Sequence, residues 1–293
     1  MPELPEVETT VRDLKKAQPK ILGALILDVW SDAKNLIKKP KSFSAFKKEI
    51  LKRKILKIWR RGKNIIFTLD KKNLLIHQKL TGHLLYGKWE KKGQEWVSQI
   101  KGPLAEDPMN RFLHLIFFLD NKYQLALSDL RKFAKVEILS EKELKKELSK
   151  IGPEPLGKEF TFEVFKKVLL KKKKGKIKQI LMDQKIIAGI GNIYSDEILW
   201  KTKIHPLKDI SEITEKEGEK IFKAIKEILP KAIQLGGESI SDFRRIRGEK
   251  GQFDKMRKVY RREGERCQRC KVKIERVKIG GRSAYFCPKC QKL

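Results

Sequence analysis

The chain has 293 residues, of which 40% are hydrophobic and 36% are charged. This length allows two domains with cores of their own, and the composition excludes a disordered chain. An excess of Lys and Arg gives a formal net charge of +32. Such an excess favours a polyanionic partner, most simply nucleic acid, although a general lysine bias would produce part of it. We expect no membrane contact and no secretory signal, because no sufficiently long apolar run and no leader pattern is present.

The chain opens with the residues MPELPEVE. If Met1 is removed, Pro2 carries the terminal amine, which is partly neutral at physiological pH and can attack a carbonyl-level carbon to form a Schiff base. Glu3 lies beside it and can move protons. The alternative is an ordinary helix start with Pro5 in the first turn, and the pattern alone favours that alternative.

The first half of the chain contains many short apolar segments separated by turn residues, which predicts a β-sandwich or a barrel. The expected strands cover 21–30, 55–59, 65–69, 74–77, 84–86, 112–119, 123–127 and 134–139. A short helix is expected over 43–51, and the weakly patterned segment 90–110 is expected to be a loop.

The second half is predicted to be helical, beginning after a break at Gly152-Pro153-Glu154-Pro155. Helices are expected over 162–170, 177–185 and 193–201, followed by one that starts at Thr214, kinks at Pro230 and ends at Gly236. The segment 243–260 is basic and polar, so we expect a flexible loop.

The last part of the chain holds all four cysteines, in the spacing Cys267-x2-Cys270-x16-Cys287-x2-Cys290. This spacing predicts a closed four-cysteine zinc site of structural type, with a redox role as the minor alternative. Between the pairs, a β-hairpin with Arg282 near its tip could present a guanidinium to a phosphate; the alternative is a solvent-facing arginine.

Three further segments suit nucleic acid, and each has a plainer interpretation. Gly189-Ile190-Gly191-Asn192 joins two helices and could bind a phosphate, or it is a helical hairpin with Asn192 as N-cap. The basic turn Arg60-Arg61-Gly62-Lys63 could equally be a solvated hairpin. The pair Arg131 and Phe133 could fill a gap in a base stack, or it is an edge arginine beside a core phenylalanine.

Together these segments, in this order, resemble the bacterial formamidopyrimidine-DNA glycosylases over essentially the whole chain. The resemblance implies an α+β fold: an antiparallel two-sheet β-sandwich with an N-terminal helix, a helix–two-turns–helix domain and a C-terminal zinc finger. The corresponding ranges are 1–140 for the catalytic domain, 141–156 for a linker, 157–260 for the helical domain with the lesion-recognition loop, and 261–293 for the finger.

The resemblance also implies an activity. The family flips an oxidised purine out of the duplex. Pro2 matches the nucleophile, which attacks C1′, so that loss of the base gives a Schiff base, and successive β- and δ-elimination cut the strand. Glu3 matches the general acid/base, and Lys63 matches a lysine that contacts the phosphate near the site. Met1 must be removed for this chemistry.

The remaining matches are DNA contacts. Asn192 and Arg282 match phosphate clamps, Arg131 and Phe133 match a wedge that fills the vacated space, and Tyr260 matches a position near the backbone of the damaged nucleotide. Leu80 stands where the family's third wedge residue is methionine. Two further departures are Leu130-Arg131-Lys132-Phe133-Ala134, for which a less rigid loop is expected, and the unusually basic loop 239–253.

The expected cofactor is one structural zinc ion, and the expected partner is duplex DNA containing oxidised bases. We expect a monomer in the cytoplasm, associated with the nucleoid. Two alternatives remain: an endonuclease VIII-like glycosylase for oxidised pyrimidines, and a zinc-finger DNA-binding protein without catalysis. Leu4-Pro5 argues against the first, and the intact Pro2, Glu3 and Lys63 argue against the second.

Overall fold

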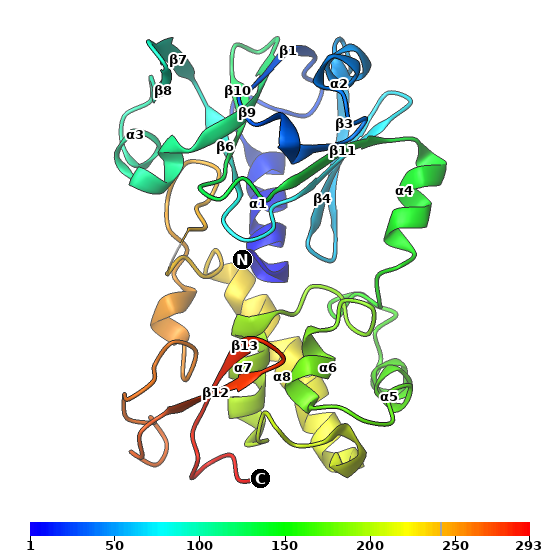
Figure 1. The fold of residues 1–293 in the computed structure, drawn as a ribbon, viewed down its shortest axis with the longest axis vertical. Coiled ribbons are helices and arrows are strands. Elements are labelled where there is room, and N and C mark those ends of the chain that lie inside the picture. Colours follow the sequence, from blue (N-terminus) through cyan, green and yellow to red (C-terminus); the bar gives the residue numbers. More distant parts are fainter. Residues whose placement is uncertain (241) are drawn as a thin grey trace. The chain divides into compact units, whose positions relative to one another are not determined.

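The computed structural model describes residues 1–240 and 242–293, which form two compact units (Figure 1). Unit 1 consists of Met1–Ser149 and Leu235–Asp254, and unit 2 of Lys150–Gln234 and Lys255–Leu293. The chain therefore returns to unit 1 after the long helix α8 (Glu215–Gln234) before it completes unit 2. Within the described ranges, no helix has both the length and the apolar character that a membrane crossing requires.

Unit 1 begins with helix α1 (Leu4–Lys16), whose apolar residues recur every three or four positions. Leu4, Val7, Val11 and Leu14 are buried, which is the face that this spacing predicts. The helix contributes to a large hydrophobic core that also includes Phe67 and Phe117, one from each of two sheets. The sequence thus places the amino end of the chain against the main core of unit 1.

The two sheets of unit 1 contain four and five strands. The first has the order β1 (Ile26–Ser31), β9 (Leu113–Leu119), β10 (Gln124–Ser128) and β6 (His83–Gly87). The second has the order β2 (Ile37–Lys39), β11 (Lys135–Leu139), β5 (Asn73–His77), β4 (Asn64–Leu69) and β3 (Ile55–Arg61). The expected sandwich of antiparallel strands is confirmed with one difference, since β2 and β11 pair in parallel. Helices α2 (Phe43–Ile50) and α4 (Glu141–Leu148) complete this part.

The segment 90–110 is not a loop, so that prediction is wrong. It contains a hairpin of β7 (Trp89–Lys92) and β8 (Glu95–Ser98), followed by the one-turn helix α3 (Pro103–Glu106) and a 3-10 turn over Pro108–Arg111. Strands of four residues are too short to show a clear alternation of polar and apolar positions. They are ordered through tertiary packing: Trp89 is buried, and the rings of Trp96 and Trp30 lie 5.2 Å apart.

The basic segment that follows α8 packs onto unit 1 instead of forming a flexible loop. Phe243, Ile246 and Phe253 are buried. Arg244 pairs with Asp107 at 2.6 Å, Arg245 pairs with Asp13 at 2.8 Å, and Arg247 donates to the carbonyl of Gln18. These arginines therefore attach the segment to the protein. Ser241 of the predicted lesion loop lies outside the described residues.

Unit 2 combines helices with a small hairpin. The helices besides α8 are α5 (Phe162–Leu170), α6 (Ile177–Met182) and α7 (Asn192–Thr202), and the hairpin is β12 (Glu275–Ile279) with β13 (Arg282–Phe286). Helix α6 ends three residues earlier than expected, while α8 continues through Pro230 to Gln234. Phe160, Phe165 and Phe222 pack ring against ring between α5 and α8.

Candidate active site and DNA-binding residues

The amino end of unit 1 is built around a buried carboxylate, Glu6. One oxygen, Oε2, accepts the backbone N–H of Glu3 at 2.7 Å, and the other, Oε1, accepts that of Glu238 at 2.7 Å. Glu3 itself is 1% exposed and Pro2 is buried. Glu6 thus fixes the backbone at two of the three predicted catalytic residues, Pro2 and Glu3. Sequence reasoning missed this role, although the three-residue spacing of Glu3 and Glu6 is that of a capping box.

The environment of the terminal amine favours its neutral form. Burial lowers the pKa of the amine at Met1 below its usual value, and the charge of Lys63 lowers it further, whereas Glu3, Glu6 and Asp242 act in the opposite direction. Removal of Met1 would transfer the amine to Pro2, which is more deeply buried. A neutral amine is the form that attacks an electrophilic carbon.

Lys63 lies in the tight turn between β3 and β4 and is 5% exposed. The turn is held by Arg60, whose Nη1 donates to the carbonyl of Gly62 at 2.9 Å. Nε of the same guanidinium donates to Glu8 of α1 at 3.0 Å. Although burial raises the pKa of Glu8, hydrogen bonds from Arg12 and Arg60 bring it below its usual value, so the carboxylate stays charged. Arg60 therefore couples the turn that carries Lys63 to the helix that carries Glu3.

The three predicted wedge residues lie on two loops of unit 1 that one carboxylate connects. Oδ2 of the fully buried Asp129 accepts the backbone N–H of Phe133 and Ala134, each at 2.8 Å, and Oδ1 accepts the hydroxyl of Thr81. The Thr81 oxygen in turn accepts the N–H of Arg131 at 3.1 Å. These bonds hold the loop that the sequence led us to expect to be less rigid.

Two of the three wedge side chains, those of Arg131 and Phe133, are exposed, and Leu80 is half-buried. Phe133 is 50% exposed, and the guanidinium carbon of Arg131 lies 4.8 Å from the centre of its ring, a cation–π contact. Leu80 sits in a tight turn that Gly82 closes by donating its N–H to the carbonyl of Gln78. A Cβ at Gly82 would lie 2.5 Å from that oxygen, so the turn requires glycine.

In unit 2, Asn192 is the first residue of α7, and Gly191 is the N-cap. The helical-hairpin interpretation of the sequence, in which Asn192 is the N-cap, is therefore off by one residue. Gln184 holds the preceding loop: its side chain accepts the N–H of Gly189 at 2.8 Å and donates to the carbonyl of Ile190 at 2.7 Å. Oδ1 of Asn192 is buried and has no hydrogen-bond partner in the described part of the chain. The backbone of this loop is thus fixed, and the amide oxygen of Asn192 can still accept a hydrogen bond.

Two consecutive carboxylates of α7 fix the segments that carry the other predicted contacts of unit 2. Asp196 pairs with Lys178 at 2.6 Å and accepts the N–H of Tyr285 at 3.1 Å, which positions the hairpin with Arg282. Burial raises the pKa of Asp196 to about 7, although Lys178 opposes this. Glu197 accepts three successive backbone N–H groups, and the last of these belongs to Tyr260.

The four cysteines meet at the base of the same hairpin. Their sulfur atoms all lie within 4.8 Å of one another, with Cys270 and Cys287 3.3 Å apart and Cys267 and Cys290 4.0 Å apart. Thiolates placed tetrahedrally around zinc, with bonds of about 2.3 Å, lie about 3.8 Å from each other. The sulfur positions therefore fit one zinc ion with no open coordination position, and the predicted structural site is confirmed.

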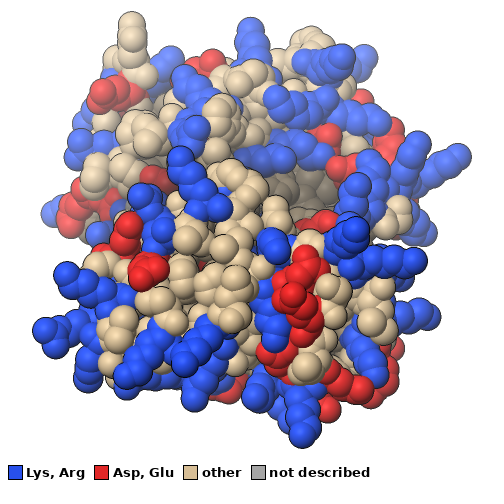
Figure 2. Space-filling model, turned by 60° about the horizontal axis from the view of Figure 1, so that its bottom comes forward, with Lys and Arg blue, Asp and Glu red and all other residues tan. Residues whose placement is uncertain are grey.

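The predicted site residues thus fall into two groups, one in each unit. Pro2, Glu3 and Lys63 belong to unit 1, where Glu3 and Lys63 both act on the amine at Met1, and the same unit carries the wedge loops. Asn192, Tyr260 and Arg282 belong to unit 2 and depend on α7 for their position. On the face in Figure 2, Lys and Arg predominate, and Asp and Glu form smaller groups.

Comparison with known proteins gives matches over nearly the whole chain. The family models that match are the formamidopyrimidine-DNA glycosylase N-terminal domain over residues 1–136, the formamidopyrimidine-DNA glycosylase H2TH domain over 151–244, and the zinc finger found in FPG and IleRS over 264–293. The formamidopyrimidine-DNA glycosylase of Pelotomaculum thermopropionicum is 38% identical over 296 residues, covering 100% of both chains. That of Carboxydothermus hydrogenoformans is 38% identical over 293 residues, with the same coverage.

Solved structures agree with this assignment. A Lactococcus lactis FPG mutant in complex with Fapy-dG-containing DNA superimposes with a TM-score of 0.85 at 34% identity, covering 100% of both chains. MutM in complex with DNA containing carbocyclic 8-oxo-G gives a TM-score of 0.84 at 34% identity, again over 100% of both chains. The chain therefore belongs to the formamidopyrimidine-DNA glycosylases, the zinc-finger DNA glycosylases of base excision repair.

Proposed function

We propose that this glycosylase excises oxidised purines from duplex DNA and then cuts the strand through a Schiff base on Pro2. The observation that carries the proposal is the burial of Pro2, Glu3 and Lys63, in surroundings that lower the pKa of the amine at Met1. An amine with a lowered pKa next to a carboxylate suits nucleophilic attack followed by proton transfer. The resemblance to MutM bound to 8-oxo-G DNA supports the lesion class.

In the proposed mechanism, the Pro2 nitrogen forms a bond to C1′ while the bond from C1′ to the damaged base breaks. Glu3 moves the protons that allow the sugar ring to open and the iminium to form. Loss of a C2′ proton then expels the 3′ phosphate, and a second elimination expels the 5′ phosphate. Lys63 binds the phosphate beside the reacting sugar. Attack by an amine with these two groups in place requires no resident redox cofactor or catalytic metal, and the zinc of the finger has no open position.

We propose the DNA contacts from the positions at which this chain matches the motifs of the family. Leu80, Arg131 and Phe133 would enter the space left by the flipped nucleotide, which is supported by the exposure of Arg131 and Phe133 and by the fixed loops of unit 1. Asn192, Arg282 and Tyr260 would hold the phosphate backbone. We also infer that the protein acts as a monomer at the nucleoid.

Covalent trapping tests the nucleophile. Borohydride reduction in the presence of a duplex with one 8-oxoguanine should join the protein to DNA, and mass spectrometry should locate the adduct on the peptide that begins with Pro2. An adduct on Lys63 would overturn the assignment of Pro2. Binding without any adduct would favour the non-catalytic alternative. Mass analysis of the free protein establishes whether Met1 has been removed, because a chain that keeps Met1 has no free amine at Pro2.

A second lesion class has support from one observation. The wild-type Lactococcus lactis FPG was crystallised with DNA containing an oxidised pyrimidine, and it matches this chain with a TM-score of 0.83 at 34% identity. A panel of duplexes with single oxidised purines or pyrimidines should show faster excision of the purines. Faster excision of the pyrimidines would replace the proposed specificity by the endonuclease VIII-like one.

A further inference from the structure

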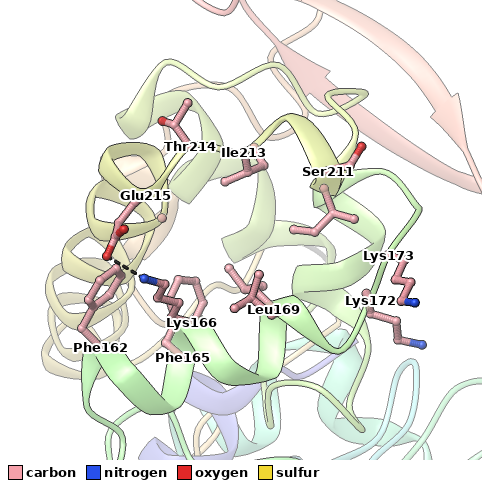
Figure 3. Close-up of a pocket in the computed structure, with 13 residues that line it drawn as sticks. Phe162, Phe165, Lys166, Leu169, Lys172, Lys173, Ser211, Ile213, Thr214 and Glu215 are labelled. Atoms are coloured by element: carbon pink, nitrogen blue, oxygen red, sulfur yellow. Dashed lines mark hydrogen bonds and ion pairs between the residues drawn. The ribbon is translucent and has the colours of Figure 1, made fainter.

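A hollow in unit 2 lies between α5 and the start of α8 (Figure 3). Its volume is about 390 Å³, and most of its wall is apolar. Phe162, Phe165 and Leu169 line it from α5, and Ile210 and Ile213 line it from the segment before α8. Asn192, Tyr260 and Arg282 are not among its lining residues, so the hollow is separate from the proposed DNA contacts.

Gly218, in the first part of α8, lines the hollow. Glycine within a helix is less favourable than alanine by roughly 1 kcal/mol. A Cβ at Gly218 would lie 3.8 Å from the ring of Phe162, an ordinary contact, so packing does not demand glycine here. A larger side chain at this position would occupy the hollow. Gly218 is therefore a position at which the volume of the hollow can be changed by substitution.

A second, smaller hollow continues the first along α5. It has a volume of about 300 Å³ and shares Phe162, Lys166, Leu170 and Glu215 with its neighbour. The ion pair between Lys166 and Glu215, at 2.8 Å, lies at this shared boundary (Figure 3). Leu170 is 70% exposed although it is a large apolar side chain. The two hollows form a groove with room for a short chain segment that has apolar side chains.

The rim of the groove is basic. Lys166 is paired with Glu215, and Lys172 lies 3.6 Å from Asp183, but Lys173 has no ion-pair partner among the residues described. Lys167 lines the smaller hollow and is exposed, as are Lys171 and Lys174 beside the larger one. The opposing charges are those of Glu163 and Glu215, which line the groove, and of Asp183 beside Lys172. The rim thus carries a net positive charge around an apolar floor.

We propose that this groove binds a short acidic segment of a partner protein, with an aromatic or branched aliphatic side chain in the larger hollow and carboxylates against the lysines. Charge complementarity supports this occupant, because an acidic segment matches the rim and an apolar side chain matches the floor. Duplex DNA would match the lysines only, since its phosphate backbone has no apolar group for the hollow. The partner would be brought to the enzyme through unit 2 without occupying the proposed DNA contacts.

Fluorescence anisotropy with a labelled peptide tests the proposal without DNA. The probe is a short peptide of aspartates with two phenylalanines, and the control peptide has alanines in their place. We expect the intact protein to bind the probe at least about tenfold more tightly than the control peptide. Equal binding of the two peptides would mean that the protein recognises only the charge of the peptide and not its apolar side chains, which would overturn the proposal.

Two substitutions at Gly218 distinguish an effect on binding in the groove from an effect on folding. Gly218→Leu fills the larger hollow and should weaken binding of the probe about tenfold. Gly218→Ala improves the helix but leaves most of the hollow open, so it should retain binding, and circular dichroism of both variants checks folding. Unchanged binding by Gly218→Leu would overturn the proposal.

A charge pair and a competing ligand complete the test. Lys173→Glu should weaken binding of the acidic probe more than Lys231→Glu, a change of the same charge at an exposed position of α8. A single-stranded oligonucleotide that competes with the probe, and loses affinity in Gly218→Leu, would assign the groove to nucleic acid and overturn the protein partner. None of these readouts depends on Pro2, so failure here leaves the proposed function unaffected.

Discussion

Nζ of Lys178 lies 2.6 Å from Oδ1 of Asp196, and neither side chain has more than 1% of its surface exposed. The same ammonium donates to the carbonyl of Ser283 at 2.8 Å, and the same carboxylate accepts the N–H of Tyr285. The pair therefore joins two helices and the finger hairpin at one buried point. Removal of either partner would leave the other charge buried without its counterion.

Asp196→Ala should lower the free energy of unfolding of unit 2 by about 3–5 kcal/mol, because the buried ammonium of Lys178 would lose the carboxylate that balances its charge. It should also speed hydrogen exchange at the N–H of Tyr285. The matched control is Glu227→Ala, which removes the partner of Lys201 from an exposed pair and should cost at most about 1 kcal/mol. Similar losses of unfolding free energy in both variants, measured by thermal denaturation, would show that the buried pair stabilises unit 2 no more than an exposed pair does.

Arg60→Met should reduce the rate of strand cleavage about tenfold, since the turn that holds Lys63 would lose its bonds to Glu8 and Gly62. Arg12 offers a control, because its side chain pairs with the same Glu8 carboxylate but is 56% exposed. Arg12→Met should leave cleavage almost unchanged. Single-turnover rates on a lesion duplex decide between the two, and equal effects would mean that Arg60 does not position the turn.

Removal of zinc should weaken DNA binding, because the finger hairpin loses the metal that holds its base. Trp200 packs against Cys267 and Cys287, so the loss should also change tryptophan fluorescence, and a Trp200→Phe variant should remove most of that change. Added zinc should restore both signals. Full nicking activity in chelator-treated protein shown to be metal-free would contradict the structural role.

Stability should fall in mild acid because of His83. Burial, and to a smaller extent the charge of Arg244, lower the pKa of its imidazole to about 4 from 6.5, while Nε2 bonds to Asn110 at 3.1 Å. Because the pKa of His83 is lowered in the folded protein, the neutral imidazole contributes fully to the free energy of unfolding above pH 6.5. This contribution is lost as the pH falls toward 4, because only the unfolded chain binds the proton in that range. The loss should reach about 3 kcal/mol. Urea denaturation of His83→Gln should show a correspondingly smaller dependence on pH.

Features with a local signature could be predicted from the sequence. The cysteine spacing gave the zinc site, the turn residues before Arg282 gave the hairpin, and the expected helix 162–170 has the bounds observed. The family and its fold followed from motifs distributed over the chain. The catalytic roles of Pro2, Glu3 and Lys63 stay predictions.

The supporting residues could not be predicted, because their partners are distant in sequence. Glu6 bonds to Glu238, and Asp129 bonds to Thr81, and neither pairing leaves a pattern in a short window. The prediction for the segment with Arg244, Arg245 and Arg247 was wrong for a related reason. Their charge contributed to the prediction of a flexible loop, whereas carboxylates and a carbonyl of unit 1 accept their hydrogen bonds.

The helix start at Glu3 restricts how this protein can be stabilised. Serine, threonine or aspartate at an N-cap commonly strengthens a helix by about 1 kcal/mol, so position 3 would be an obvious target for engineering. Here the N-cap residue is also the proposed proton carrier, and the residue that completes the cap, Glu6, aligns it. A more stable first turn would therefore come at the expense of catalysis, and thermostable variants should be sought by changes elsewhere on α1.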